Sequence, residues 1–336
     1  MNRPEAAGRS EIPAIFALWL IVTHLSAGHA QTGLEIEWAE PMPLVESSLL
    51  LDADSHGSRM IVVGERGHVL LSNNGGARWQ QVAVPTRSTL TAVRIVGSDH
   101  AWAVGHDGLI LHSDDGGLSW AEQHRSQETD RPLLDIWFAD PRRGMAIGAY
   151  GLMLSTEDGG RTWRDALGKD EGAHANAIAE APDGSLYIAG EFGSILRSDD
   201  RGRSWQQLPS PYRGSFFGLL PLQDVTILVF GLRGHLFRSE DRGITWRRIQ
   251  TGTAATLLAG LVRADGSIVI AGLNGVLLLS DDGGGSFQLR HLVDRRGIAA
   301  LIELGPDQLL AVGEGGLTKI PARDSSAKAS VTVEAR

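Results

Sequence analysis

The sequence has no cysteine among its 336 residues. This absence excludes a disulfide framework, a thiolate zinc site, an iron–sulfur cluster, a cysteine nucleophile and a lipid-modified cysteine anchor. Charged residues are also few, at 21%, and acidic residues outnumber basic ones to give a formal net charge of −9. Nucleic acid binding needs a surplus of Lys and Arg, so this charge balance argues against such binding. A patch of arginines on one face is still compatible with the negative net charge.

A membrane-spanning run is missing as well. The apolar run near the N-terminus, Ile12 to Val22, has only 11 residues, which is too short to span a bilayer. It follows Arg3 and Arg9 and precedes Gly28-His29-Ala30, whose small residues suit positions −3 and −1 of a cleavage site. We therefore predict a signal peptide over residues 1–30 and export to the periplasm or an equivalent compartment, with an uncleaved anchor as the alternative.

Glycine, by contrast, is abundant, with 42 copies in a chain that is 42% hydrophobic and can bury a core. A glycine ends a short apolar strand every 41 to 43 residues, at Gly64, Gly105, Gly148, Gly190, Gly231, Gly272 and Gly313. Three residues later comes a second glycine, at Gly67, Gly108, Gly151, Gly193, Gly234, Gly275 and Gly316. Two residues between paired glycines, with alternating apolar positions on both sides, predict a tight antiparallel hairpin whose turn needs φ > 0.

A second repeated motif, Ser/Thr-x-Asp-x-Gly-x-Ser/Thr-Trp, follows the third strand of each unit and is known as an Asp box. Its acids are Asp115, Asp158, Asp200, Asp241 and Asp282, and the first copy has Asn74 instead. Its aromatics are Trp79, Trp120, Trp163, Trp205, Trp246 and, in the sixth copy, Phe287. The short carboxylate suits a hairpin turn between strands three and four, and the aromatic residue suits packing between neighbouring units.

Four short antiparallel strands per 41 to 43 residues is the period of a β-propeller blade. In the second unit we predict strands at 91–96, 101–105, 109–113 and 120–123. Seven glycine pairs but six Asp boxes leave the last unit one strand short, and we predict that residues near Leu34 to Trp38 supply it and close the ring. The predicted fold is an all-β, seven-bladed propeller over residues 31–320, followed by a polar tail over 321–336.

With these motifs the chain resembles the photosystem II stability/assembly factor family, whose members are exported seven-bladed propellers of Asp-box repeats. The resemblance covers roughly Leu34 to Ile320. It implies a non-enzymatic scaffold that assists the assembly or stability of a membrane protein complex, as in photosynthesis, by binding one of its segments on the lumenal or periplasmic side. Similar proteins also occur in bacteria without photosynthesis, so the resemblance leaves the client open.

Catalytic and metal sites are weakly supported by the sequence. The box carboxylates recur in every complete unit from the second to the sixth, whereas a catalytic acid is needed once, and the bidentate Glu of a calcium loop is missing. His68 and His235 occupy equivalent positions, and no histidine pair has ligand spacing, so we expect no metal and no cofactor.

An Asp-box sialidase, another glycoside hydrolase or a glycan-binding propeller is the alternative function. A sialidase would need a Phe/Tyr-Arg-Ile-Pro segment, three clustered arginines and a tyrosine nucleophile beside a glutamate. The Arg-Ile-Pro segment is absent. Of the three tyrosines, Tyr150 lies between paired glycines and Tyr187 lies within a strand, which leaves Tyr212 beside Arg213 as the candidate nucleophile.

Arginines recur in the loops that join the fourth strand of one unit to the first strand of the next. These loop arginines are Arg87, Arg131, Arg213 and Arg296, and the paired-glycine turns add Arg66 and Arg233. On a propeller these loops and turns share the face opposite the Asp boxes. We therefore predict a monomer that binds an acidic or polar segment of a peptide or membrane protein there, with ordinary solvated arginines paired with Glu65, Asp130 or Asp294 as the alternative.

Overall fold

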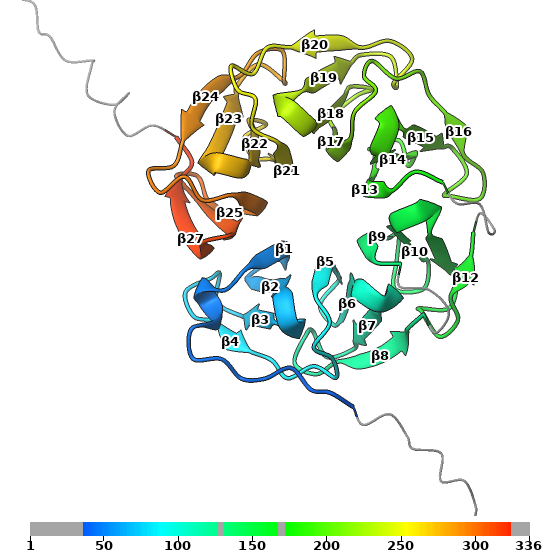
Figure 1. Ribbon diagram of the computed structural model, residues 1–336, viewed down its shortest axis with the longest axis vertical. Coiled ribbons are helices and arrows are strands. Elements are labelled where there is room, and N and C mark those ends of the chain that lie inside the picture. Colours follow the sequence, from blue (N-terminus) through cyan, green and yellow to red (C-terminus); the bar gives the residue numbers. More distant parts are fainter. Residues whose placement is uncertain (1–35, 127–130, 167–171, 324–336) are drawn as a thin grey trace, which may run out of the picture. The chain divides into compact units, whose positions relative to one another are not determined.

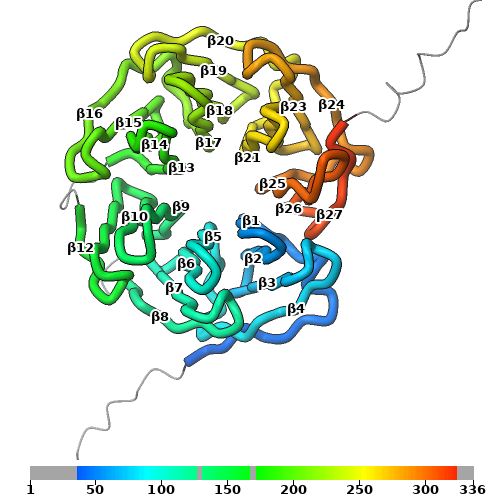
Figure 2. Tube along the Cα trace, turned by 180° about the vertical axis from the view of Figure 1, so that it is seen from behind, coloured from blue at the N-terminus to red at the C-terminus, as the bar shows by residue number. Residues whose placement is uncertain are grey.

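Seven antiparallel sheets stand in a ring around a central axis in the computed structural model, which describes residues 36–126, 131–166 and 172–323 (Figure 1). Each sheet is one blade, and the blades follow one another in chain order around the ring, as the view from behind also shows (Figure 2). This confirms the predicted all-β, seven-bladed propeller. The predicted signal peptide lies outside the described residues.

Within each blade the strands lie side by side, and their order goes from the centre of the ring outward. The innermost strands are β1 (Leu50–His56), β5 (Leu90–Val96), β9 (Leu133–Phe138), β13 (Ala175–Glu180), β17 (Phe216–Pro221), β21 (Leu257–Val262) and β25 (Ile298–Gly305). The second strands are β2 (Arg59–Gly64), β6 (His100–Gly105), β10 (Gly144–Gly148), β14 (Leu186–Gly190), β18 (Ile227–Gly231), β22 (Ile268–Gly272) and β26 (Gln308–Gly313).

The third strands are β3 (Val69–Ser72), β7 (Ile110–Ser113), β11 (Met153–Thr156), β15 (Ile195–Ser198), β19 (Leu236–Ser239), β23 (Val276–Ser280) and β27 (Gly316–Pro321). The outermost strands are short, and they are β4 (Gln80–Gln81), β8 (Ala121–His124), β12 (Arg164–Asp165), β16 (Gln206–Gln207), β20 (Arg247–Ile249) and β24 (Gln288–His291). The strands of the second blade lie within a residue of their predicted bounds.

Short 3-10 turns complete the secondary structure of the described residues. One of them, η1 (Val45–Ser47), precedes the first strand. The others join strands two and three, and they are η2 (Glu65–Gly67), η3 (His106–Gly108), η4 (Ala149–Gly151), η5 (Glu191–Gly193), η6 (Leu232–Gly234) and η7 (Leu273–Gly275).

The two glycines of each pair serve different purposes. The first, as at Gly64 with φ −171°, is extended, and a Cβ there would meet the backbone carbonyl of Leu49 that precedes the innermost strand. The second, as at Gly67 with φ +72°, has the left-handed conformation that was predicted for the turn. Close approach of the backbone therefore explains the first glycine, and positive φ explains the second.

The Asp boxes form the predicted turns between strands three and four. In the second box, Asp115 Oδ1 accepts hydrogen bonds from the backbone N–H groups of Leu118 and Ser119 at 2.9 Å and from the Ser113 hydroxyl at 2.8 Å. The equivalent hydrogen bonds from Thr162 hold the pKa of Asp158 at about 2, well below its usual range. These carboxylates therefore fasten their own turns.

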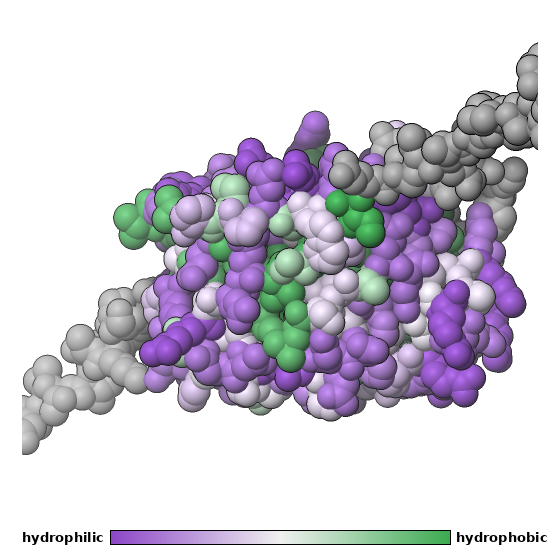
Figure 3. Space-filling view, turned by 90° about the horizontal axis from the view of Figure 1, so that it is seen from below, coloured by the Kyte–Doolittle hydropathy of each residue, from purple (hydrophilic) through white to green (hydrophobic). Residues whose placement is uncertain are grey.

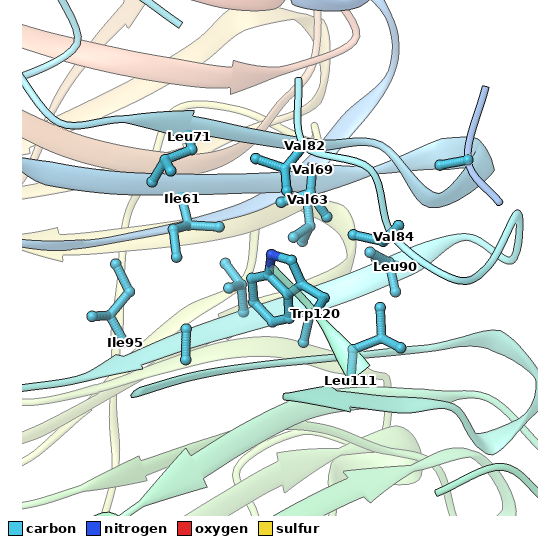
Figure 4. Packing of buried hydrophobic residues seen from close by; sticks show 14 of the residues in the cluster. Ile61, Val63, Val69, Leu71, Val82, Val84, Leu90, Ile95, Leu111 and Trp120 are labelled. Carbon is cyan, nitrogen blue, oxygen red and sulfur yellow. The ribbon is translucent and has the colours of Figure 1, made fainter. Parts of the chain in front are cut away.

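Each box aromatic packs between two blades. Trp120, which is 6% exposed, lies among Ile61, Val69 and Leu71 of the first blade as well as Leu111 of its own (Figure 4). Every other box aromatic likewise joins an interior cluster that is shared by its own blade and the preceding one around the ring, namely Trp79, Trp163, Trp205, Trp246 and Phe287. The predicted inter-blade packing is confirmed.

The ring closes differently from the prediction. The seventh sheet has three strands among the described residues, β25, β26 and β27, and the described part of the segment predicted as its fourth strand, Ile36 to Trp38, forms no strand in it. Ala39 donates a backbone hydrogen bond to Val84 O of the first blade at 3.0 Å. This hydrogen bond, together with the one that the Trp38 carbonyl accepts from Arg87, holds the segment against the first blade, which is why it does not pair with β27.

N-terminal residues nevertheless join the first and last blades. Val45 packs in the interior cluster that the first and seventh blades share. The Glu46 carbonyl lies beside Gly316, in the place that the Thr86 carbonyl takes beside Gly67. Ala322, only 1% exposed, extends the packed chain just past residue 320, and the predicted tail from 324 onward lies outside the described residues.

We expect Trp120→Ala to lower the free energy of unfolding by about 3 to 5 kcal/mol, because it empties a site that two blades share. Chemical denaturation measures the change. Leu118→Ala is the matched control, since Leu118 lies in the same turn but is 57% exposed, and it should cost less than about 0.5 kcal/mol. Equal effects of the two variants would contradict the packing role of Trp120.

Candidate functional site

The ring presents two chemically different faces. On one face, which we call the turn face, the strand two–three turns meet the loops that enter the next blade, as where Ser126 donates its backbone N–H to Asp107 O at 3.0 Å. On the opposite face, the box face, the Asp boxes meet the strand one–two turns, as where Gly116 donates to Asp99 O at 2.6 Å. The predicted placement of loops and turns on one face, opposite the boxes, therefore agrees with these contacts.

A side chain stands at the tip of each 3-10 turn on the turn face. These residues precede the second glycine and have φ between +53° and +61°, which holds them in the left-handed region: Arg66, Asp107, Tyr150, Phe192, Arg233 and Asn274. Non-glycine residues adopt this conformation at a cost, and here the surrounding hairpin imposes it in six blades. In each of these six blades the fold therefore displays one side chain whose residue type the turn does not dictate.

The predicted arginines all lie on the turn face, but they differ in their contacts. Arg87 forms an ion pair with Glu40 at 3.0 Å and donates from Nε to Trp38 O at 3.1 Å, so it holds the N-terminal segment. Arg131 is half-buried and has interactions of its own. The guanidinium of Arg296 extends over the turn at Gly315 of the seventh blade.

The remaining three predicted arginines are exposed. Arg66 and Arg233 occupy turn tips of the first and fifth blades, and Arg213 lies in the loop that enters the fifth blade. Arg213 and Arg233 therefore flank one blade, whereas Arg66, Arg87 and Arg296 belong to the arc formed by the seventh and first blades. Arg131, just before the first strand of the third blade, belongs to neither group, so the six arginines share a face but are spread around it.

Exposed aromatic residues lie on the same face, and the sequence analysis did not assign them a binding role. Phe192 is 78% exposed and Tyr150 is 52% exposed, at the tips of neighbouring blades. The Tyr150 ring also contacts His174 edge-on, with ring centroids 4.7 Å apart. The signal was present in the sequence, because both residues stand between paired glycines. The side of the ring seen in Figure 3 is mainly hydrophilic, with a few hydrophobic areas between the hydrophilic ones.

Carboxylates line the innermost strands and tie blades together. Asp52 Oδ2 accepts the backbone N–H of Val93 in the next blade at 2.8 Å, and Asp135 Oδ2 accepts that of Ile178 at 2.8 Å. Burial and then the charge of Asp135 raise the pKa of Asp52 to about 7, and burial raises the pKa of Asp135 to about 6. Raised pKa values often mark catalytic sites, but here both carboxylates hold neighbouring strands in place.

The candidate nucleophile is half-buried and packs against the interior. The Tyr212 ring lies against His235 at 4.2 Å between centroids, and against Phe216 and Phe237 at 6.0 and 6.2 Å. These contacts are those of a side chain at the edge of the core. Within residues 36–126, 131–166 and 172–323, no group of three or more His, Asp or Glu side chains is arranged to hold a metal ion.

The fold and its two faces define a class, the Asp-box β-propeller that displays variable side chains on one face of a rigid ring. In the described part of the chain, no helix has the length and hydropathy to cross a bilayer. The model of the family described as "Photosynthesis system II assembly factor YCF48" matches residues 34–128 and 122–257. The chain belongs to this family, as the repeat pattern suggested.

Curated relatives match over short segments. The Photosystem II assembly protein Ycf48 of Synechococcus sp. (strain JA-3-3Ab) is 39% identical over 64 residues, which is 18% of this chain and 19% of the relative. The chloroplastic Photosystem II stability/assembly factor HCF136 of Cyanidioschyzon merolae (strain NIES-3377 / 10D) is 45% identical over 47 residues, 13% of this chain and 11% of the relative. These alignments span a fifth or less of the relatives' length.

Solved structures resemble the chain over nearly its whole ring. "YCF48 bound to D1 peptide" has a TM-score of 0.68 at 20% identity, covering 85% of this chain and 97% of that one. A streptogramin B lyase structure also has a TM-score of 0.68, at 15% identity, with 84% and 96% covered. At such identities the likeness shows the propeller fold, which assembly factors and enzymes share.

We expect Asp52→Asn to raise the melting temperature at about pH 8 and to raise it less at about pH 5. The ordinary carboxyl pKa is 3.8 and the folded one about 7, so the folded chain binds a proton across this interval and gains stability as the pH falls through 7. The amide keeps an acceptor for Val93 without the buried charge.

Thermal unfolding at both pH values measures the effect, at about 2 °C per kcal/mol for a chain of this size. Asp281→Asn, at an exposed carboxylate of the sixth Asp box, is the matched control. A loss of stability of the same size at both pH values would contradict the role given to the Asp52 charge.

Proposed function

We propose that this protein is a non-enzymatic assembly or stability factor for a membrane protein complex, and that its turn face binds a segment of a client protein. The observation that carries the proposal is the pairing of exposed arginines, Arg213 and Arg233, with exposed aromatic tips, Tyr150 and Phe192, on one face of a rigid ring. A ring that displays variable side chains from fixed turns is suited to recognition. Family membership supports the same role.

The client segment carries acidic and apolar side chains. Guanidinium groups pair with carboxylates, and the left-handed tips leave Phe192 78% and Tyr150 52% exposed, which is apolar surface that a partner can bury. A related structure is described as bound to a D1 peptide, which is a membrane-protein segment. In a photosynthetic host the client of this chain is a photosystem subunit, and in other hosts it is another membrane protein.

The location follows from the same proposal. Residues 1–30 act as a signal peptide, the mature chain from Gln31 works as a monomer in the periplasm or a lumen-equivalent compartment, and it meets the membrane through its client. Mass spectrometry of the protein from fractionated cells shows whether residues 1–30 are removed and in which compartment the protein is found. Light scattering on the purified protein measures its oligomeric state. A full-length cytosolic species would contradict the export of the protein.

We expect the double variant Arg213→Glu/Arg233→Glu to weaken client binding about tenfold, since two exposed ionic contacts are worth roughly 0.5 to 1 kcal/mol each and both are reversed. Client capture from detergent-solubilised membranes, followed by titration of the identified segment, measures it. Arg142→Glu/Arg161→Glu on the box face is the control with the same charge change. Equal binding by both double variants would remove the arginines from the proposal.

We expect Phe192→Ser to weaken the same binding severalfold without changing its dependence on salt, because it removes apolar contact and no charge. For the wild-type chain the affinity should fall between about 50 and 300 mM salt as exposed charges are screened. Leu118→Ser, at an exposed position of the box face, is the control. A Phe192→Ser variant that binds like wild type would show that the client contacts only the arginines.

A further inference from the structure

His68 is a buried histidine, only 1% exposed, in the first blade. It directly follows Gly67, the second glycine of the pair. The equivalent residues of the second and third blades are Leu109 and Leu152, which are buried as well. In the first blade an imidazole therefore takes a core position that these two blades fill with leucine.

The N-terminal segment, by which we mean residues 36–48, contacts the first blade at this histidine. Ser48 Oγ lies 3.1 Å from His68 Nδ1, and Ala39 lies beside Gly67, the residue before His68. The backbone N–H of Ala39 donates to Val84 O at 3.0 Å. The imidazole thus lies where two parts of the N-terminal segment, around Ala39 and around Ser48, are held against the blade.

The hydrogen bonds of the serine determine which imidazole nitrogen carries the proton. The Ser48 hydroxyl donates to Val45 O at 2.7 Å, so its oxygen accepts from His68 Nδ1–H. His68 Nε2 then carries a lone pair, and this buried atom has no hydrogen-bond partner in the described part of the chain. A proton on Nε2 would create a buried N–H and a positive charge with no acceptor, which is costly.

The charges on the histidine's own turn do not compensate for its burial. Burial lowers the pKa of His68, while the charge of Glu65 raises this pKa and the charge of Arg66 lowers it. The Glu65 carboxylate accepts the backbone N–H of Leu49 at 3.3 Å, so it already has a partner. Burial is the largest of these effects, and it favours the neutral imidazole.

The other segments that pack here carry their charges at the surface. Glu40 of the N-terminal segment pairs with Arg87 at 3.0 Å, and these side chains are 67% and 50% exposed. Glu37 and Glu46 are exposed as well. Water and salt screen such charges, so they act only weakly on a buried ring.

We propose that His68 is a proton-operated latch for the N-terminal segment. While the imidazole is neutral, the segment stays on the first blade. The open form, in which the segment lifts off and water reaches Nε2, binds a proton that the closed form excludes. Acid therefore shifts the equilibrium toward the open form, because the two forms differ in their affinity for the proton.

Opening changes the turn face through Arg87. Both partners of this arginine, the Glu40 carboxylate and the Trp38 carbonyl, belong to the N-terminal segment. When the segment lifts off, Arg87 loses both and becomes a free cation in the arc that also carries Arg66. The use of this cation for client binding rests on the proposed function, whereas the latch itself does not.

Amide hydrogen exchange on the mature chain tests the latch, because it detects opening even when the open form is rare. The exchange rate of the Ala39 amide, divided by its intrinsic rate at each pH, gives the ratio of open to closed segment. An exposed histidine has a pKa of about 6.5, so this ratio should rise about tenfold between about pH 7.5 and about pH 5.5. Carboxylates with ordinary pKa values stay ionised over this interval.

His68→Leu copies the residue of the second and third blades, and it should make the ratio independent of pH over the same interval. His68→Asn, which keeps an N–H for Ser48 Oγ and takes up no proton, supplies the test if the leucine variant does not fold. His235→Leu is the matched control, because His235 has the equivalent position in the fifth blade. It should keep the tenfold rise.

The proposal is overturned if the ratio at Ala39 stays constant between these pH values in the wild-type chain. It is also overturned if a folded His68→Leu or His68→Asn chain shows the wild-type rise. The measurement uses no client, so its outcome is separate from that of the binding experiments on the turn face.

Discussion

The structure depends on the sharing of hydrophobic clusters between neighbouring blades. A four-stranded sheet of this size cannot bury both faces alone, and each box aromatic completes its cluster only when the previous blade is in place, as Trp120 does against Ile61 and Leu71. Because the last cluster joins the seventh blade to the first through Val45, the ring has no free sheet face. Stability is thus a property of the closed ring and belongs to no blade by itself.

Because of this shared packing, some positions of the repeat are restricted in residue type and others are not. Strand residues and the first glycine of each pair are fixed by close contacts, as at Gly64 beside Leu49. The tip residue one place before the second glycine touches solvent, so its identity varies from Arg66 to Phe192 without cost to the core. Recognition by the turn face follows from this freedom, because the same rigid hairpin can present a charge in one blade and an aromatic ring in the next.

Most of the architecture was predictable because it repeats. Glycine spacing and Asp boxes predicted the blades, the strand bounds and the two faces, since each unit supplies an independent copy of the same pattern. Features that occur once escaped prediction. Ala39 follows the first blade through its hydrogen bond to Val84, and the partners of Arg87 depend on that path. Likewise, the carboxylate of Asp52 gains its raised pKa from the packing of inner strands that periodicity does not describe.

The seam beside Ala166 shows how much variation in side-chain volume the repeat tolerates without a change of fold. Replacing a buried Leu by Ala typically costs about 2 to 5 kcal/mol, a loss that would unfold many small domains. Here the seam keeps its remaining contacts, since Trp205, Met145 and Ile178 stay in one cluster, and six further clusters hold the ring. One position per repeat can therefore vary in volume while the backbone of Ala166 keeps the hydrogen bond that Leu208 makes in the next blade. The same redundancy that makes the fold regular therefore tolerates a change of side-chain volume inside a single seam.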